Sequence, residues 1–180
     1  MFYQLNLKEY FNSTGITTLD EASKGSLDIF ANLSFPKEYF QENMYFNNIP
    51  FKIELDSILD NISIDDELKV SFERNNFTDV YILGACNNGN FSNNIHFYSE
   101  ENLIFSKKIH ITDLMEEIPY KRNEKFVTSD YVYTPNGKLD TTISLWVERI
   151  QFSKEFLLDS LTLEENPFIH IFAITLGGEG

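Results

Sequence analysis

The feature that most constrains this chain is the alternation of apolar and polar residues along most of its length. Residues 68–72 (LKVSF) and 109–111 (IHI) place every second apolar side chain on one face of an expected strand. Because the side chains of a β-strand point alternately to opposite faces, the pattern predicts half-buried strands. Helical periodicity is weak, with short candidates near residues 20–24 and 153–156. The sequence therefore predicts an all-β protein.

Turn residues divide the expected strands into antiparallel pairs. A continuous apolar run at residues 80–83 ends at Gly84, which is typical of a more central strand. Residues 99–102 (SEEN) are expected to close a hairpin, and residues 135–137 (PNG) form a second turn before a long alternating stretch. We find no internal repeat and no shift in composition. These features predict one domain over residues 1–180, an antiparallel jelly-roll β-sandwich, with a closed barrel as the alternative.

Composition supports a folded domain and disfavours several partners. Hydrophobic residues make up 42% of the 180 residues and aromatic residues 15%, which is enough for a sizeable core. There are 28 acidic and 14 basic residues, so the net charge is −14. This acidic balance disfavours nucleic acid and anionic lipid as partners, and no apolar run approaches the ~20 residues of a membrane helix.

The N-terminus and the cysteine content bear on location. The first twelve residues have neither a basic region nor a continuous apolar region, so no secretory signal is expected and the predicted location is cytoplasmic. Cys86 is the single cysteine and cannot form an internal disulfide. Its apolar neighbours predict a buried thiol rather than a nucleophile.

Six segments, in order, resemble a galactose-binding-like β-sandwich family whose members are modules attached to bacterial glycoside hydrolases. The segments are residues 10–17 (YFNSTGIT), 33–40 (LSFPKEYF), 47–53 (NNIPFKI), 80–89 (VYILGACNNG), 144–152 (SLWVERIQF) and 169–176 (IHIFAITL). The resemblance implies a jelly roll of eight or nine strands that binds its ligand on end loops or on a concave face. Residues 28–32 (DIFAN) depart from the family, because they keep an acidic residue but lack the glycines that precede the Ser-aromatic-Pro segment.

The leading functional hypothesis is non-catalytic binding of a carbohydrate or a similar polyhydroxylated small molecule. Such a site needs an aromatic surface beside amide or carboxylate groups. Trp146, Glu148, Asn12, Asp28 and His96 are the candidate ligand-binding residues. Tyr131 and Tyr133 are candidates for further aromatic surface. Packing of Trp146 in the core is the alternative for that residue.

A second hypothesis is a small enzyme of a biosynthetic pathway that uses histidine and carboxylate groups on the ligand face. His96, His110 and His170 each lie in an alternating segment, where imidazole could act as acid, base or metal ligand. Two pairings are considered, His96 with Glu148 and His110 with His170. The sequence does not decide which residue would be catalytic or whether the protein is an enzyme. A third hypothesis is a structural module that forms a homodimer through its sheet.

No cofactor is established by the sequence, and two metals are left open. One is a histidine-bound metal, although no H-x-H, HExxH or paired CxxC spacing is present. The other is a structural calcium ion at Asp28 with Asn12 or Asn32, because sandwiches of the resembled type often carry one. The acidic runs at residues 56–67 and 116–117 are expected to be solvated loops.

Overall fold

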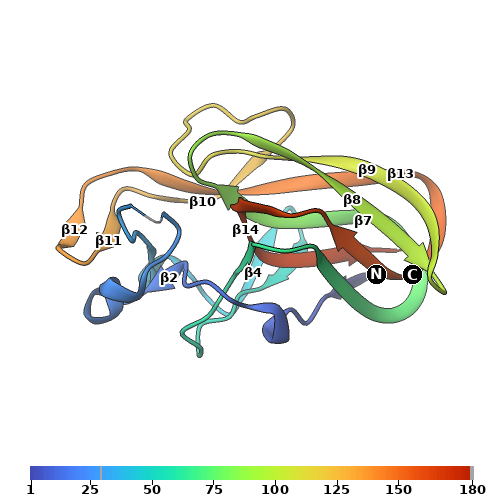
Figure 1. The fold of residues 1–180 in the computed structure, drawn as a ribbon, viewed down its shortest axis with the longest axis horizontal. Coiled ribbons are helices and arrows are strands. Elements are labelled where there is room, and N and C mark those ends of the chain that lie inside the picture. The colour runs from blue at the N-terminus through green and yellow to red at the C-terminus, as the bar shows by residue number, and fades with distance from the viewer. Residues whose placement is uncertain (29, 179–180) are drawn as a thin grey trace.

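The computed structural model describes residues 1–28 and 30–178, and it confirms an all-β, sandwich-like protein (Figure 1). The helices in this part of the chain are short 3-10 turns: η1 (Lys8–Tyr10), η2 (Leu19–Lys24) and η3 (Lys37–Tyr39). None of these helices has the length and apolar character needed to span a bilayer.

Eight strands of the described chain form one main sheet. Its principal order is β1-β14-β7-β13-β8-β9, with β10 also paired to β13 and β6 also paired to β14. The bounds of these strands are β1 (Phe2–Gln4), β6 (Ile62–Ile64), β7 (Leu68–Cys86), β8 (Phe91–Ser99), β9 (Asn102–Ile111), β10 (Glu124–Ser129), β13 (Ile143–Leu163) and β14 (Asn166–Gly177). All of these strand pairs are antiparallel.

Two long strands, β7 and β13, run through both layers of the sandwich. Residues 146–151 of β13 pair with residues 79–84 of β7, and after a shift of register residues 156–163 pair with residues 68–77. The first part of this pair lies beside β10 and β14, and the second part lies beside β8. In Figure 1 the β8–β9 hairpin and β13 run together along the upper side and curve at one end of the molecule. We call the half with β10 and β14 the first layer and the half with β8 and β9 the second layer.

The inner core lies between the two layers. It includes Ile82 and Ile174 of the first layer and Ile95 and Ile109 of the second. Each fully buried side chain of this kind contributes about 1.5–3 kcal/mol to folding. This burial explains the alternation on β8 and at the end of β9, residues 109–111, where every second side chain is buried.

A second core covers the outer face of the first layer. Leu83 and Leu145 pack there with Phe35 and Phe51 of the N-terminal segments. β7 is therefore apolar on both faces near residues 80–83, as the continuous run predicted. The short strands of these covering segments are β2 (Ile16–Thr17), β3 (Phe35–Pro36), β4 (Asn43–Phe46), β5 (Ile49–Lys52), β11 (Val132–Thr134) and β12 (Gly137–Leu139).

The hairpin closed by residues 99–102 is confirmed, with His96 opposite Ser106. The PNG turn lies between β11 and β12. Two expectations were wrong. Residues 153–156 are part of strand β13 rather than a helix, and residues 68–72 and 80–83 belong to one strand rather than two. Polar residues of β7 that looked like a turn instead lie where the long strand passes from one layer to the other.

Candidate functional site

A groove of about 890 Å³ opens between β9 and β13, and we call it the β9–β13 groove. On this edge of β13, pairing with β10 ends at Val147 and pairing with β8 begins at Ser160. The interruption leaves room for a concavity beside the intervening residues. The lining residues are Lys107, Lys108, His110, Lys121, Arg122, Glu124, Glu148, Arg149, Ile150, Gln151, Phe152 and Ser153.

The side chain of Glu148 connects the two layers through hydrogen bonds at this groove. This side chain comes from β13 of the first layer, and the residue is only 5% exposed. The His110 backbone N–H of β9 donates to Oε1 at 3.2 Å, and Asn123 Nδ2 donates to Oε2 at 2.6 Å. Asn123 Nδ2 also donates to the His110 carbonyl at 2.7 Å. Glu148 and Asn123 thus satisfy the backbone groups of His110 at the edge of β9.

Burial raises the pKa of Glu148 to about 7, while the hydrogen bonds from His110 and Asn123 and the charge of Arg122 act in the opposite direction. A carboxyl group with this pKa is shared between its protonated and ionised forms near neutral pH. Such a group can give or take a proton, and it can also act as a structural hydrogen-bond partner.

His110 lies on the β9 side of the groove. Its Nδ1 lies 2.7 Å from Ser92 Oγ, and Ser92 Oγ is 3.3 Å from the Tyr120 hydroxyl. Burial, followed by the positive charges of Lys121 and Lys108, lowers the pKa of His110. The imidazole is therefore neutral at neutral pH, when one ring nitrogen carries a proton and the other can accept one.

Positive side chains surround these two residues. Lys107 and Lys108 are exposed on β9, and Lys121 and Arg122 are exposed before β10. Within residues 1–28 and 30–178, none of the four forms an ion pair with a carboxylate. The groove thus combines a neutral imidazole, a buried carboxyl group and unpaired cations.

A family model described as the AziU2-like beta-sandwich domain matches residues 3–179. The chain belongs to this family. The match supports the β-sandwich expected from sequence, and it spans both layers and the covering N-terminal segments of the AziU2-like domain. No curated protein matches the chain.

Trp146 of this AziU2-like domain lies in the core, which is the alternative that the sequence left open. The residue is 0% exposed, and its Nε1 donates to the Asp113 carbonyl at 3.1 Å. Trp146 shares a face of β13 with Glu148 and Ile150, where Asp113 after β9 contacts it, while the N-terminal segments cover the opposite face at Leu145. Trp146 therefore presents no aromatic surface to a ligand in this structure.

The other candidate ligand-binding residues are dispersed, and only Glu148 lines the groove. His96 contacts Glu164, with 3.4 Å between Nε2 and Oε1. Asn12 Oδ1 accepts from the Ser63 N–H at 2.7 Å. Asp28 Oδ1 accepts hydrogen bonds from the backbone N–H groups of Phe30 and Ala31, each at 2.8 Å.

His170 is separate from the groove and is 2% exposed. Its Nδ1 lies 2.9 Å from Asn61 Oδ1, and its Nε2 lies 3.3 Å from Asn87 Nδ2. Burial lowers the pKa of His170 to about 4. The considered pairing of His110 with His170 is not observed, and neither is that of His96 with Glu148.

Cys86 is buried as expected, and burial raises the pKa of its thiol. In the described part of the chain, no group of three or more His, Cys, Asp and Glu side chains could hold a metal ion.

Tyr131 and Tyr133 form a separate cluster outside the groove. Both hydroxyls donate to Glu38 Oε1, at 2.5 and 2.6 Å. The ammonium group of Lys138 lies 3.7 Å from the centre of the Tyr131 ring. One face of that ring is therefore already covered by the protein's own cation.

The sequence reading missed Asn123 and the four cations of the groove. No local sequence pattern points to Asn123, because its role is to bind the backbone of His110, which lies on another strand. The cations do carry one, since two basic pairs, KK at residues 107–108 and KR at residues 121–122, stand out in a strongly acidic chain.

Proposed function

We propose that the β9–β13 groove binds a small polyhydroxylated molecule of the carbohydrate class. The supporting observation is the groove itself, whose volume of about 890 Å³ falls among those of small-molecule sites. Its lining joins apolar side chains, Ile150 and Phe152, to polar side chains such as Gln151 and Ser153.

This lining matches the two kinds of surface on a sugar ring. The apolar C–H face would pack on the edges of Ile150 and Phe152 that reach the groove, since both residues are otherwise buried in the inner core. The hydroxyl groups would exchange hydrogen bonds with Gln151, Ser153 and Glu124 on the exposed rim.

Titration with a panel of monosaccharides, monitored by ligand-observed NMR, tests this proposal. Gln151→Ala is expected to weaken binding several-fold, since a hydrogen bond to the ligand is lost. Gln41→Ala is the matched control, because Gln41 is exposed in a different depression with Tyr39 and Tyr45. Equal effects of the two substitutions, or no saccharide binding, would contradict the proposal.

A second candidate function is acid/base catalysis in the same groove. The observation that favours it is the hydrogen-bonded series of His110, Ser92 and Tyr120 beside Glu148, whose pKa of about 7 suits proton transfer near neutral pH. In this reading His110 would exchange a proton with the substrate, and Ser92 would orient the imidazole.

His110→Asn separates the two candidates. Under the catalytic reading, the substitution abolishes turnover of a bound substrate and leaves the melting temperature nearly unchanged, because the His110 backbone still binds Glu148. Under the binding reading, no turnover is seen in either protein.

We further propose that this β-sandwich is a jelly roll related to the galactose-binding-like family. The support is its antiparallel two-layer arrangement together with the six resembling segments. Strand connections that superpose on those of that family would establish the relation, and different connections would exclude it.

A further inference from the structure

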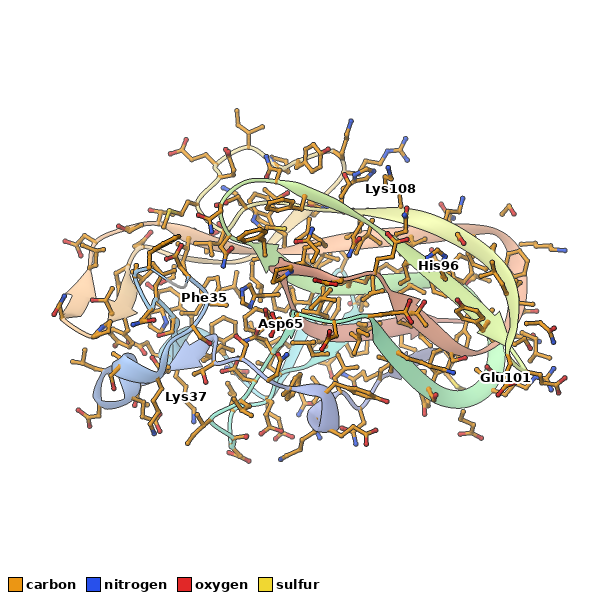
Figure 2. The ribbon with its side chains drawn as sticks, viewed as in Figure 1. Phe35, Lys37, Asp65, His96, Glu101 and Lys108 are labelled. Atoms are coloured by element: carbon orange, nitrogen blue, oxygen red, sulfur yellow. The ribbon has the colours of Figure 1, made fainter. Side chains whose placement is uncertain are left out.

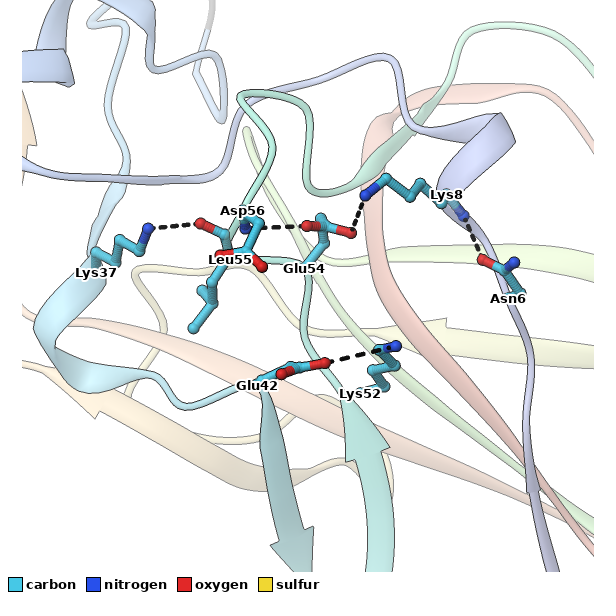
Figure 3. A network of polar contacts seen from close by, with 8 residues as sticks. All are labelled: Asn6, Lys8, Lys37, Glu42, Lys52, Glu54, Leu55 and Asp56. Carbon is cyan, nitrogen blue, oxygen red and sulfur yellow. Dashed lines mark hydrogen bonds and ion pairs between the residues drawn. The ribbon is translucent and has the colours of Figure 1, made fainter.

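The four groove cations have no acidic partner among the described residues, a property they share with exposed lysines such as Lys69, and they all line one concave surface. Figure 3 shows a contrasting cluster, in which Lys8 pairs with Glu54 at 3.1 Å and Lys52 pairs with Glu42 at 3.5 Å. In the same cluster Lys37 donates to the Leu55 carbonyl at 2.5 Å. The three lysines of this cluster bind carboxylate or carbonyl oxygens of the protein itself, so the cluster does not indicate a site for an external anion.

The chain has 28 acidic and 14 basic residues, so a local excess of cations runs against its overall charge. Lys107, Lys108, Lys121 and Arg122 nevertheless gather at one groove, although they come from two segments of the sequence. In Figure 2, Lys108 lies on the upper side of the molecule and Lys37 on the lower side.

The cations bracket the polar centre of the groove. Lys121 and Lys108 are close enough to His110 to lower its pKa, and Arg122 acts on Glu148. Two acidic side chains, Glu124 and Glu148, also line the groove, and Arg149 is neutralised by Asp79 at 2.7 Å. The lining therefore keeps an excess of positive charge inside a concave surface, which focuses the local field.

We infer that the groove takes a ligand that carries a phosphate-like oxyanion, such as a phosphorylated sugar, bound by Lys107, Lys108, Lys121 and Arg122. This inference deepens the proposed function and rests on the same groove. A small ligand fits better than a polyanion, because the net charge of −14 repels an extended chain of phosphates while a single oxyanion meets only the local cations.

Isothermal titration calorimetry at low ionic strength tests the inference with three probes: inorganic phosphate, glucose 6-phosphate and glucose. Inorganic phosphate and glucose 6-phosphate are expected to bind the wild-type protein. Lys121→Gln and Arg122→Gln should each weaken this binding about tenfold, because each removes a charge-assisted hydrogen-bond donor.

Lys69→Gln is the matched control, since Lys69 is exposed on β7 outside the groove and its substitution changes the net charge equally. The affinity of the Lys69→Gln variant for inorganic phosphate and glucose 6-phosphate should equal that of the wild type. Melting temperatures of all three variants are expected to match, because the substituted side chains are exposed.

The outcomes separate the two proposals. Binding of phosphate with no gain for glucose 6-phosphate supports the oxyanion site and contradicts saccharide recognition. Binding of glucose alone supports saccharide recognition and overturns the oxyanion site. Binding of neither phosphate probe, equal weakening by Lys69→Gln, or binding of a long polyanion such as RNA in place of phosphate would also overturn it.

Discussion

Asp60 fixes the backbone at Gly15, which lies in a closely packed part of the structure. Its buried carboxylate, 1% exposed, accepts the backbone N–H groups of Gly15 and Ile16, each at 2.8 Å. A Cβ atom on Gly15 would lie 2.5 Å from the Phe172 ring and 2.8 Å from Asn61 Nδ2. Close packing therefore requires glycine here, and the expectation that residues 56–67 are solvated is wrong for Asp60. Burial raises the pKa of Asp60 to about 7, against the hydrogen bonds that it accepts.

Glu148 makes the stability of the protein depend on pH. Its pKa rises from 4.5 in the unfolded chain to about 7 in the folded protein. Between these values the folded state holds a proton that the unfolded state has lost, so this contribution to stability falls as pH rises through the window. Glu148→Gln removes this titration, whereas Asp60 and His170 still titrate in both proteins.

We therefore expect the free energy of unfolding of Glu148→Gln, relative to that of the wild type, to increase from pH 4.5 to pH 7. Urea denaturation at several pH values measures this difference. Parallel curves for the two proteins would show that Glu148 has an ordinary pKa in the folded state.

The buried position of Trp146 predicts a loss of stability upon truncation. Trp146→Ala should cost about 3–5 kcal/mol, because it leaves a large cavity in the core and removes the bond to Asp113. Trp146→Phe should cost less and leave ligand affinity unchanged. Denaturant titration and calorimetry measure the two effects. If Trp146→Phe had normal stability but no longer bound ligand, the prediction would be wrong, and Trp146 would belong to the binding site.

At the scale of elements, β7 and β13 determine the architecture because each contributes to both layers. Shifts of register between Gln151 and Phe156, and between Leu158 and Ser160, mark where β13 passes between them. Such irregularities bend a strand and increase its twist. The irregularities therefore lie where the β7–β13 pair changes from the first layer to the second.

Close packing of β7 against β14 predicts a cost for any side chain at Gly84. A Cβ atom there would lie 2.7 Å from the His170 carbonyl oxygen, which is backbone and cannot rotate away. Gly84→Ala should therefore lose about 1–3 kcal/mol of stability. Gly177→Ala is the control on the same strand pair, because its closest contacts are ordinary at 3.4 Å. Equal melting temperatures for the two variants would contradict this packing.

At the scale of the whole molecule, a net charge of −14 disfavours the compact state through self-repulsion. In each ion pair of the main sheet, at least one of the two side chains is exposed to solvent, as in the pair of Arg74 and Glu100. Such pairs contribute little to stability, so they offset little of this repulsion.

We expect the melting temperature to rise as sodium chloride increases from low ionic strength to about 0.2 M, where the Debye length falls below ~10 Å. Differential scanning calorimetry in a buffer without phosphate or sulfate measures the shift free of groove binding. A fall in melting temperature with salt would mean that attractive pairs outweigh the repulsion.

The sequence by itself determined the all-β class, the hairpin of β8 and β9 and the buried state of Cys86, because alternation and turn chemistry are local properties. Only the tertiary structure decided that β7 is one strand and that Trp146 and Asp60 are buried. It also decided that Glu148 and Asn123 meet at the backbone of His110, and that the two basic pairs share one groove. These outcomes depend on which strands become neighbours across the two layers, and pairing between residues distant in sequence leaves no local pattern.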